Sequence, residues 1–470
     1  MANSLSILGV SALLLAAAAN AATLAPANDI VFPSTSNSQN PLIYSGGNTP
    51  WYAGPNVNGI DNSVPKKCTV QQAAYVVRHG SRFPDSGSYS SWVGIHDKIQ
   101  IAVNGKGFKA RDELAFIPDW KPVLTNSTLQ IAQESMTGWK EAHDLGYQLR
   151  ARYPDFYEDG SPFYVWANHT SGTVVSVNST GSVSAIGNSL GPSDSCPMFG
   201  ATSSGGNNVT DFDATWVPKA LKRINSMVSG KLTFDETDIL FFPYLCGYES
   251  QLTGNLSPWC SVFTQEELRN YAYSQDLSYY YGVGPGASGP APKLFLPFLQ
   301  SLTTLLSKGP GQTGVTADGG SFTVPNLIMA FLNDNQIAEM TAAMGMFDDE
   351  APLPDDHVPK DHLYNVSHFI TMRGTVAFEV LNCEVSSGRK TSDELYLRIL
   401  FNDAVYPIPR CQNGPGKSCL LSDYISMIEK KSKKAGNWLD YCNVTETKEP
   451  VAGASFFTDL SLDFLTMVSP

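Results

Sequence analysis

The feature that most constrains the fold is an apolar run at residues 72–77 that ends abruptly in Arg78-His79-Gly80. The run is short and partly β-branched, which favours a buried strand over a helix. In open α/β sheets, ligands bind outside the carboxyl ends of the strands. The sequence therefore predicts a buried strand that carries His79 to the ligand-binding edge of a sheet.

Helical and strand-like patterns occur in blocks along the rest of the chain. Helical periodicity is found at 127–152, 216–229, 264–280 and 292–307. Apolar, strand-like runs return at 327–332, 368–382 and 394–401. The simplest architecture is an α/β domain formed by both ends of the chain and interrupted by a largely helical insertion.

Loop composition and this block order give the expected domain boundaries. We expect residues 67–155 and 320–470 to form the α/β domain, and residues 156–319 to form the mostly helical insertion. Residues 22–66 are rich in Pro, Ser, Asn and Gly, which predicts an extended arm on the surface.

The first residues predict export. Residues 4–19 are apolar and end in small side chains, and Ala19-Asn20-Ala21 resembles a signal-peptidase site. We therefore interpret residues 1–21 as a cleaved signal peptide. A membrane anchor would need about 18 or more strongly apolar residues, which is more than this run provides. The expected location is secreted and extracellular.

Cysteine and sequon content fits the same compartment. The eight cysteines, an even number without a C-x-x-C pair, predict disulfides, although these residues alone leave the pairing open. Seven N-x-[ST] sequons predict glycosylation, at Asn126, Asn168, Asn178, Asn208, Asn255, Asn365 and Asn443.

Charge and histidine content narrow the expected partners. The formal net charge is −13 and no basic run is present, which argues against nucleic-acid binding. The seven histidines are scattered, without H-x-x-x-H or a carboxylate cluster at ligand spacing, so no metal or other cofactor is expected. We expect a small-molecule partner and no membrane contact, and the oligomeric state stays open.

The segment Arg78-His79-Gly80-Ser81-Arg82-Phe83-Pro84 has the residue types that phosphate chemistry needs. Phosphoryl transfer depends on positioning and on stabilising the charge of the phosphoryl oxygens. Arg78 and Arg82 can bind those oxygens bidentately, and a neutral His79 can attack phosphorus to form a phosphohistidine. A bare R-H-G tripeptide would more often hold a satisfied core histidine. The seven-residue match at the end of a strand favours the phosphate site.

This segment resembles the R-H-G-x-R-x-P motif of the histidine acid phosphatase family. Further stretches resemble its branch of secreted fungal acid phosphatases and phytases, at 136–154, 188–197, 257–264 and 279–286. The resemblance implies a phosphoglycerate-mutase-like α/β fold, a mixed sheet flanked by helices with a mostly α-helical inserted domain. It also implies a phosphohistidine on His79, phosphate binding by Arg78 and Arg82, and no metal. The disulfides that it implies are Cys68–Cys383, Cys196–Cys442, Cys246–Cys260 and Cys411–Cys419.

The family's second motif is His-Asp, and here Asn333-Asp334 stands in its place after a predicted strand. The resemblance implies that Asp334 protonates the leaving group and that Asn333 lies at the phosphate. An Asn amide can donate a hydrogen bond but cannot carry charge. Asp334 could instead be a helix N-cap, a role compatible with the catalytic one. His143-Asp144 lies inside a predicted helix and is interpreted as solvated surface.

A second departure concerns a further phosphate-binding arginine. The family usually carries it in an R-V-x-x-[ST]-A helix after a strand like residues 164–168, but here the chain continues as Asn168-His169-Thr170-Ser171-Gly172-Thr173. The third arginine therefore has no counterpart, through a deletion or a mistaken gene model. Arg150 and Arg152 are not substitutes, because they belong to the end of the preceding helix.

Two hypotheses from different classes follow. The first is a secreted acid phosphatase with His79 and Asp334 as catalytic residues, acting on phosphomonoesters broadly and on phytate as a second choice, because an acidic chain with 31 Lys and Arg offers few cations for so dense an anion. The second is a catalytically impaired pseudophosphatase that binds a phosphorylated ligand. A cofactor-independent mutase is disfavoured because the chain is expected to be exported.

Overall fold

The computed structural model describes residues 40–168, 176–179, 185, 187–202, 206–387, 390–445, 456–463 and 465–468. Its strands are β1 (Cys68–Arg78), β2 (Lys109–Ala110), β3 (Val165–Ala167), β4 (Ser176–Ser179), β5 (Val228–Ser229), β6 (Thr313–Val315), β7 (Ser321–Thr323), β8 (Leu327–Leu332), β9 (Thr375–Ser387), β10 (Lys390–Phe401), β11 (Ala404–Tyr406), β12 (Cys419–Leu420) and β13 (Leu465–Val468). The predicted signal peptide, residues 1–21, lies outside the described residues.

The helices confirm most of the predicted blocks and extend several of them. They are α2 (Ser86–Val103), α3 (Ser127–Gln130), α4 (Met136–Arg152), α5 (Phe199–Thr202), α6 (Gly206–Asn225), α7 (Glu236–Thr253), α8 (Gln265–Gly282), α9 (Leu296–Lys308), α10 (Asp334–Met344), α11 (Val366–Phe369), α12 (Leu421–Ala435) and α13 (Trp438–Tyr441). Short 3-10 turns complete the set, among them η1 (Pro41–Tyr44) and η2 (Gly46–Asn48).

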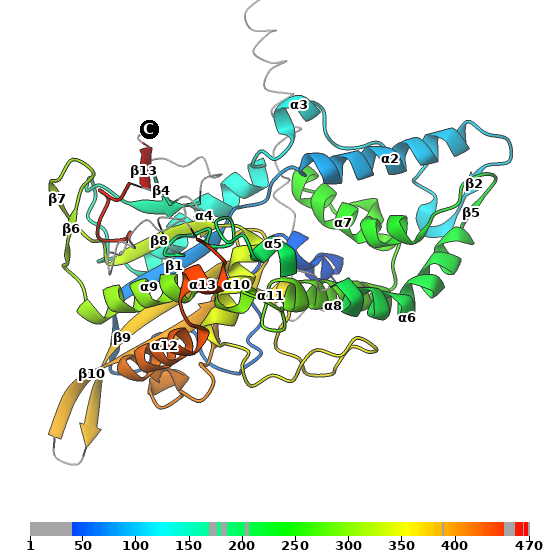
Figure 1. Ribbon diagram of the computed structural model, residues 1–470. Helices are drawn as coiled ribbons and strands as arrows, with labels where there is room; N and C mark the ends of the chain where they lie inside the picture. The colour runs from blue at the N-terminus through cyan, green and yellow to red at the C-terminus, as the bar shows by residue number, and fades with distance from the viewer. Residues whose placement is uncertain are drawn as a thin grey trace, which may run out of the picture.

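A mixed sheet forms the centre of the molecule, in the order β11-β10-β9-β1-β8-β3-β4-β13 (Figure 1). β1 runs parallel to β8 and antiparallel to β9, so the two ends of the chain meet in the middle of the sheet. Arg78 pairs with Leu332, which places the residues after β1 and after β8 at the same sheet edge. The apolar run at 72–77 had predicted that His79 would lie at this edge of the sheet.

The two faces of the sheet are covered unequally. Ile328, Ala330 and Leu332 of β8 face a large core that also contains α9, α10 and α12. Leu327 and Met329 point to the opposite face, where a smaller cluster is covered by α4. This alternation follows from the two-residue period of a strand. The face under α4 is the one from which the active-site cavity is built.

Two predicted elements are wrong in part. The helix expected at 127–152 is broken into α3 and α4, because Ala132 has a φ of 60° and Glu134 forms an isolated bridge with Arg82. The strand expected from 368 begins only at Thr375, since α11 and a turn precede it and Arg373 has a φ of 53°. The apolar periodicity of a sequence indicates where a helix or strand can form. A single residue in the left-handed region can break that element, and the periodicity does not change.

Residues 156–319 contain the helices α6, α7 and α8, and α7 lies alongside α2 (Figure 1). β3 and β4 fall within the same range but belong to the main sheet, where β3 pairs with β8. Within the described residues, none of the helices combines the length and apolar character that crossing a bilayer requires.

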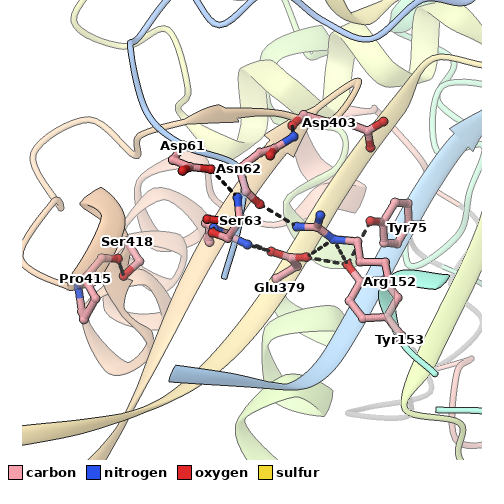
Figure 2. Close-up of polar contacts among 11 residues, drawn as sticks. Asp61, Asn62, Ser63, Tyr75, Arg152, Tyr153, Glu379, Asp403, Pro415 and Ser418 are labelled. Atoms are coloured by element: carbon pink, nitrogen blue, oxygen red, sulfur yellow. Dashed lines mark hydrogen bonds and ion pairs between the residues drawn. The ribbon is translucent and has the colours of Figure 1, made fainter. Parts of the chain in front are cut away.

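The N-terminal arm is more deeply integrated than the predicted surface arm. Its described part forms η1 and η2, and Leu42, Gly46 and Gly47 are buried. Further along, Arg152 and Arg398 donate to the carbonyl oxygens of Asn62 and Ser63 at 3.1 and 2.6 Å (Figure 2). The buried Arg398 and the partly buried Arg152 therefore hold the arm against the sheet.

The structure contains four disulfides, and they are the pairs that the family resemblance implied: Cys68–Cys383, Cys196–Cys442, Cys246–Cys260 and Cys411–Cys419. The first joins β1 to β9, and the second joins chain segments 246 residues apart. Cross-links over such long loops remove much of the conformational freedom of the unfolded chain.

Candidate active site

The loop after β1 is shaped by the close approach of α4. A Cβ on Gly80 would come within 2.8 Å of the Gly138 Cα, and one on Gly138 would collide with the Ser81 carbonyl oxygen. Both positions therefore require glycine. The Gly80 N–H donates to Glu134 at 3.0 Å, which fixes the turn that presents His79.

His79 is held as a neutral imidazole with one nitrogen directed outward. Its Nδ1 lies 2.9 Å from the Gly80 carbonyl oxygen, an acceptor, so Nδ1 carries the proton and Nε2 keeps the lone pair. Burial, followed by the positive charge of Arg78, lowers the pKa of His79 to about 3. The ring can therefore act as a nucleophile even in acid.

Arg78 and Asp334 form an ion pair beside this ring. The buried Arg78 guanidinium donates to Asp334 Oδ2 at 3.0 Å and to the Ile370 carbonyl at 2.8 Å. Tyr279 also donates to Asp334 Oδ2, at 2.8 Å. Burial raises the pKa of Asp334, but Arg78, His79 and Tyr279 outweigh it and hold the pKa at about 2. Tyr279 was not predicted as a site residue.

Arg82 and Asn333 complete the set of predicted site residues. Arg82 is half-buried and donates to the Phe83 carbonyl at 2.9 Å, while Asn333 lines the same cavity at the start of α10. The Gln336 side chain accepts the Asn333 N–H at 2.9 Å. The N-terminus of α10 thus points its partial positive charge toward the site. The N-cap of α10 is Asn333 and Asp334 is the first residue of the helix, so the alternative that Asp334 is the N-cap is wrong by one position.

Glu141 is a buried residue of the site that the sequence analysis missed. It accepts the Ser81 N–H at 2.7 Å, the Ser81 hydroxyl at 2.9 Å and the Trp51 N–H at 3.1 Å. Burial raises its pKa, and the Ser81 and Trp51 donors oppose this. The signal was available, because Glu141 lies on the apolar face of its helix, one turn before Leu145.

Arg373 is a second missed residue, and it supplies another guanidinium to the cavity wall. It donates to the Glu141 carbonyl at 3.1 Å and lies 3.6 Å over the Trp51 ring. Burial lowers its pKa to about 10, so it stays cationic in acid. Its place in an apparent strand gave no hint of this role.

One cavity of about 1280 Å³ brings the predicted site residues together. His79, Arg78, Arg82, Asn333 and Asp334 all line it. The third arginine of the family pattern is missing from residues 169–175, and these residues lie outside the described part of the chain.

The remaining sequence predictions fall on the surface, with one exception. His143 is 83% exposed and contacts only Asp144 and solvent, in agreement with its interpretation as a solvated helix residue. Of the six sequon asparagines whose side chains the structure describes, Asn168 is the buried one, and it donates to Asp194 at 3.3 Å. Asn126, Asn255 and Asn443 are exposed. A glycan at Asn168 would have to displace a buried contact.

Comparisons with known proteins agree with this geometry. The family model of the histidine phosphatase superfamily, branch 2, matches residues 69–181 and 166–402. Acid phosphatase PHO12 of Saccharomyces cerevisiae is 26% identical, covering 88% of this chain and 89% of that protein. Phytase PHO112 of Candida albicans is 25% identical over 89% and 91%. The crystal structure of the phytase from D. castellii superposes with a TM-score of 0.74 at 24% identity, covering 91% and 93%, which confirms the expected fold class.

Proposed function

The chain belongs to branch 2 of the histidine phosphatase superfamily, and from that premise we propose that it is an acid phosphatase that hydrolyses phosphomonoesters through His79. The observation that carries the proposal is the state of this residue. Its Nε2 is unprotonated because Nδ1 donates to the Gly80 carbonyl and because its pKa is about 3. A neutral nucleophile is thereby available in a cationic pocket at acidic pH.

In the first step, the Nε2 lone pair attacks phosphorus and the bond to the ester oxygen breaks. Arg78 and Arg82 bind the phosphoryl oxygens, and the N-terminus of α10 adds its partial charge. Asp334 gives its proton to the departing alkoxide. The products are the free alcohol and a phosphohistidine on His79.

In the second step, the Asp334 carboxylate takes a proton from water as the water oxygen attacks phosphorus. The P–N bond breaks, its electrons return to Nε2, and inorganic phosphate leaves. The low pKa of Asp334 keeps this carboxyl group ionised, as the base role requires. A bound phosphate shares Arg78 and adds negative charge, and both effects raise the pKa of Asp334 in the complex toward the value that an acid needs.

A pseudophosphatase that binds a phosphorylated ligand is the second candidate, and it rests on the two departures. Asn333 replaces a residue that could be cationic. Only eight residues, 168–175, connect the parallel strands β3 and β4, whereas such a crossover usually needs about a dozen or more. The short connection supports the interpretation that the segment with the third arginine is absent. Losing one such donor costs about 10²–10³ in rate.

The deciding experiment measures hydrolysis of p-nitrophenyl phosphate at acidic pH by the native protein, His79→Ala and His143→Ala. We expect turnover by the native protein and by His143→Ala, whose side chain is on the surface, and none by His79→Ala. Quenching during turnover in alkaline denaturant, in which phosphohistidine is stable, should trap phosphate on His79. Phosphate on Ser81 would overturn the mechanism, and phosphate binding without turnover by the native protein would favour the pseudophosphatase.

Secretion and glycosylation are part of the same proposal. The four disulfides fit an oxidising compartment, and the predicted leader supplies the route. Expression in a secreting host, followed by N-terminal sequencing of the protein in the medium, tests both, since the mature chain should begin near residue 22.

A further inference from the structure

The active-site cavity continues beyond the phosphate end into an apolar groove. Its volume of about 1280 Å³ is larger than the 300–1,000 Å³ of most ligand sites, so a phosphoryl group occupies only one end. The groove is lined by aliphatic and aromatic side chains of α4, β3, β8 and the loop before β3, namely Leu145, Leu149, Tyr153, Phe156, Phe163, Val165, Leu327, Met329 and Phe331.

The floor of the groove leads directly from the catalytic residues. Leu327, Met329 and Phe331 of β8 line it, and the strand then passes into Asn333-Asp334. From Phe331 back to Leu327 the strand rises about 13 Å, at about 3.3 Å per residue. The cavity therefore begins at His79 and extends along β8, where Leu327 and Met329 line it although they are only 5% and 3% exposed.

The wall opposite β8 is one face of α4. Trp139, Ala142, Gly146 and Leu149 line the cavity at spacings of three and four residues, so they share a helix face. Trp139 is 68% exposed at this wall, and a Cβ on Gly146 would meet no atom within 4 Å. This face of α4 therefore exposes apolar side-chain surface to the cavity and leaves unfilled space beside Gly146.

The charges around the cavity do not favour a polyanion. Among the described residues that line it, five carboxylates face four arginines: Asp85, Glu134, Asp159, Asp194 and Asp334 against Arg78, Arg82, Arg150 and Arg373. Arg150 is engaged by Asp159 at 3.2 Å and by the carbonyl oxygens of Pro154 and Tyr157. Positive charge is concentrated only next to His79.

We propose that the preferred substrates are phosphomonoesters whose leaving group carries an apolar chain, with the phosphate at His79 and the chain in the groove. This inference rests on the proposed phosphatase function. The groove is continuous with the site that holds the phosphate, so a chain attached to that phosphate is the occupant that both ends of the cavity can bind together.

The test compares ethyl phosphate with decyl phosphate, below the concentration at which the latter forms micelles. Full removal of one methylene from water favours binding by about fourfold, so partial burial should raise kcat/KM for decyl phosphate at least about tenfold above ethyl phosphate. Gly146→Phe fills the groove and should abolish most of this ratio. Gly94→Phe makes the same change on α2, where a Cβ also meets no atom, and should preserve the ratio.

Each outcome separates the inference from the function on which it rests. Equal kcat/KM for both esters, with p-nitrophenyl phosphate hydrolysed, would overturn the groove assignment and leave the phosphatase proposal intact. If no ester is hydrolysed, the phosphatase proposal fails. The affinities of ethyl phosphate and decyl phosphate, measured by calorimetry, then test whether the groove binds an apolar chain. Tighter binding of decyl phosphate, lost in Gly146→Phe, would support the assignment, and equal binding would contradict it.

Discussion

His79 keeps a free lone pair in acid because it is buried in a cationic environment. An unperturbed imidazole, with a pKa near 6.5, is largely protonated below about pH 5.5 and cannot attack phosphorus. Burial, with Arg78 and Arg82, lowers the pKa of His79 to about 3. The same arginines that bind the phosphate therefore also keep the nucleophile unprotonated.

Asp334→Asn should separate substrates by their leaving groups. An amide cannot donate the proton that an alkoxide needs, so we expect kcat for an alkyl phosphate to fall by about 10²–10⁴. p-Nitrophenyl phosphate needs little protonation and should lose far less. Parallel assays of the two substrates with the same variant provide the measurement, and equal losses would mean that Asp334 is not the acid.

Asn333→His should restore a group that can be cationic beside the phosphate. We expect higher kcat/KM below about pH 6, fading as the imidazole loses its proton. Arg78 and the start of α10 disfavour the cation, which moves the gain toward lower pH. A pH profile of kcat/KM measures it, with Asn104→His at the exposed end of α2 as the control outside the cavity. No gain at any pH would remove Asn333 from the phosphate site.

At the scale of elements, the sequence predicted the strands around the site and missed the contacts between elements. β1 and β8 were predicted because both are short apolar runs buried on two sides. Arg373 was missed because its role depends on a long-range contact with α4 that has no local pattern. Glu141 was missed although its place on the apolar face of α4 was a local signal. The break before α4 was missed because it depends on the backbone of Ala132.

The ion cluster in Figure 2 joins β9, β10, the end of α4 and the arm. Glu379 accepts from Arg152 at 2.7 Å and from Arg398 at 2.6 and 2.9 Å, while Tyr153 donates to it at 2.5 Å. Burial raises the pKa of Glu379, but Arg398 and Arg152 outweigh it and lower the pKa. This carboxylate is therefore the shared counter-ion of two arginines.

Glu379→Gln should destabilise the fold by about 3–5 kcal/mol, because it leaves the buried Arg398 and the partly buried Arg152 without their counter-ion. Urea denaturation provides the measurement. Glu384→Gln is the matched control on the same strand: its pair with Lys67 is exposed, so we expect a loss below about 1 kcal/mol. Similar losses in both variants would show that Glu379 contributes no more than a surface pair.

At the scale of the whole molecule, acid conditions suit the buried carboxyl groups. Burial is the largest cause of a raised pKa in eight of the described acidic residues: Glu134, Glu141, Asp213, Glu249, Asp276, Glu339, Glu350 and Asp403. A group whose pKa is higher in the folded state binds more protons there than in the unfolded chain. Its stabilising effect is complete below the unfolded pKa and is lost as pH rises through the folded pKa.

Glu249 is the clearest case, because burial raises its pKa to about 7 although Ser257 and Trp120 donate to it at 2.6 and 2.8 Å. A rise from 4.5 to about 7 corresponds, at about 1.4 kcal/mol per pH unit, to about 3 kcal/mol of stability lost between about pH 4.5 and pH 8. We expect the native Tm to fall over this interval, and Glu249→Gln to fall less steeply because an amide does not ionise. Glu429→Gln, on the exposed face of α12, should follow the native curve. Parallel curves for the native protein and Glu249→Gln would mean that Glu249 remains ionised in the fold.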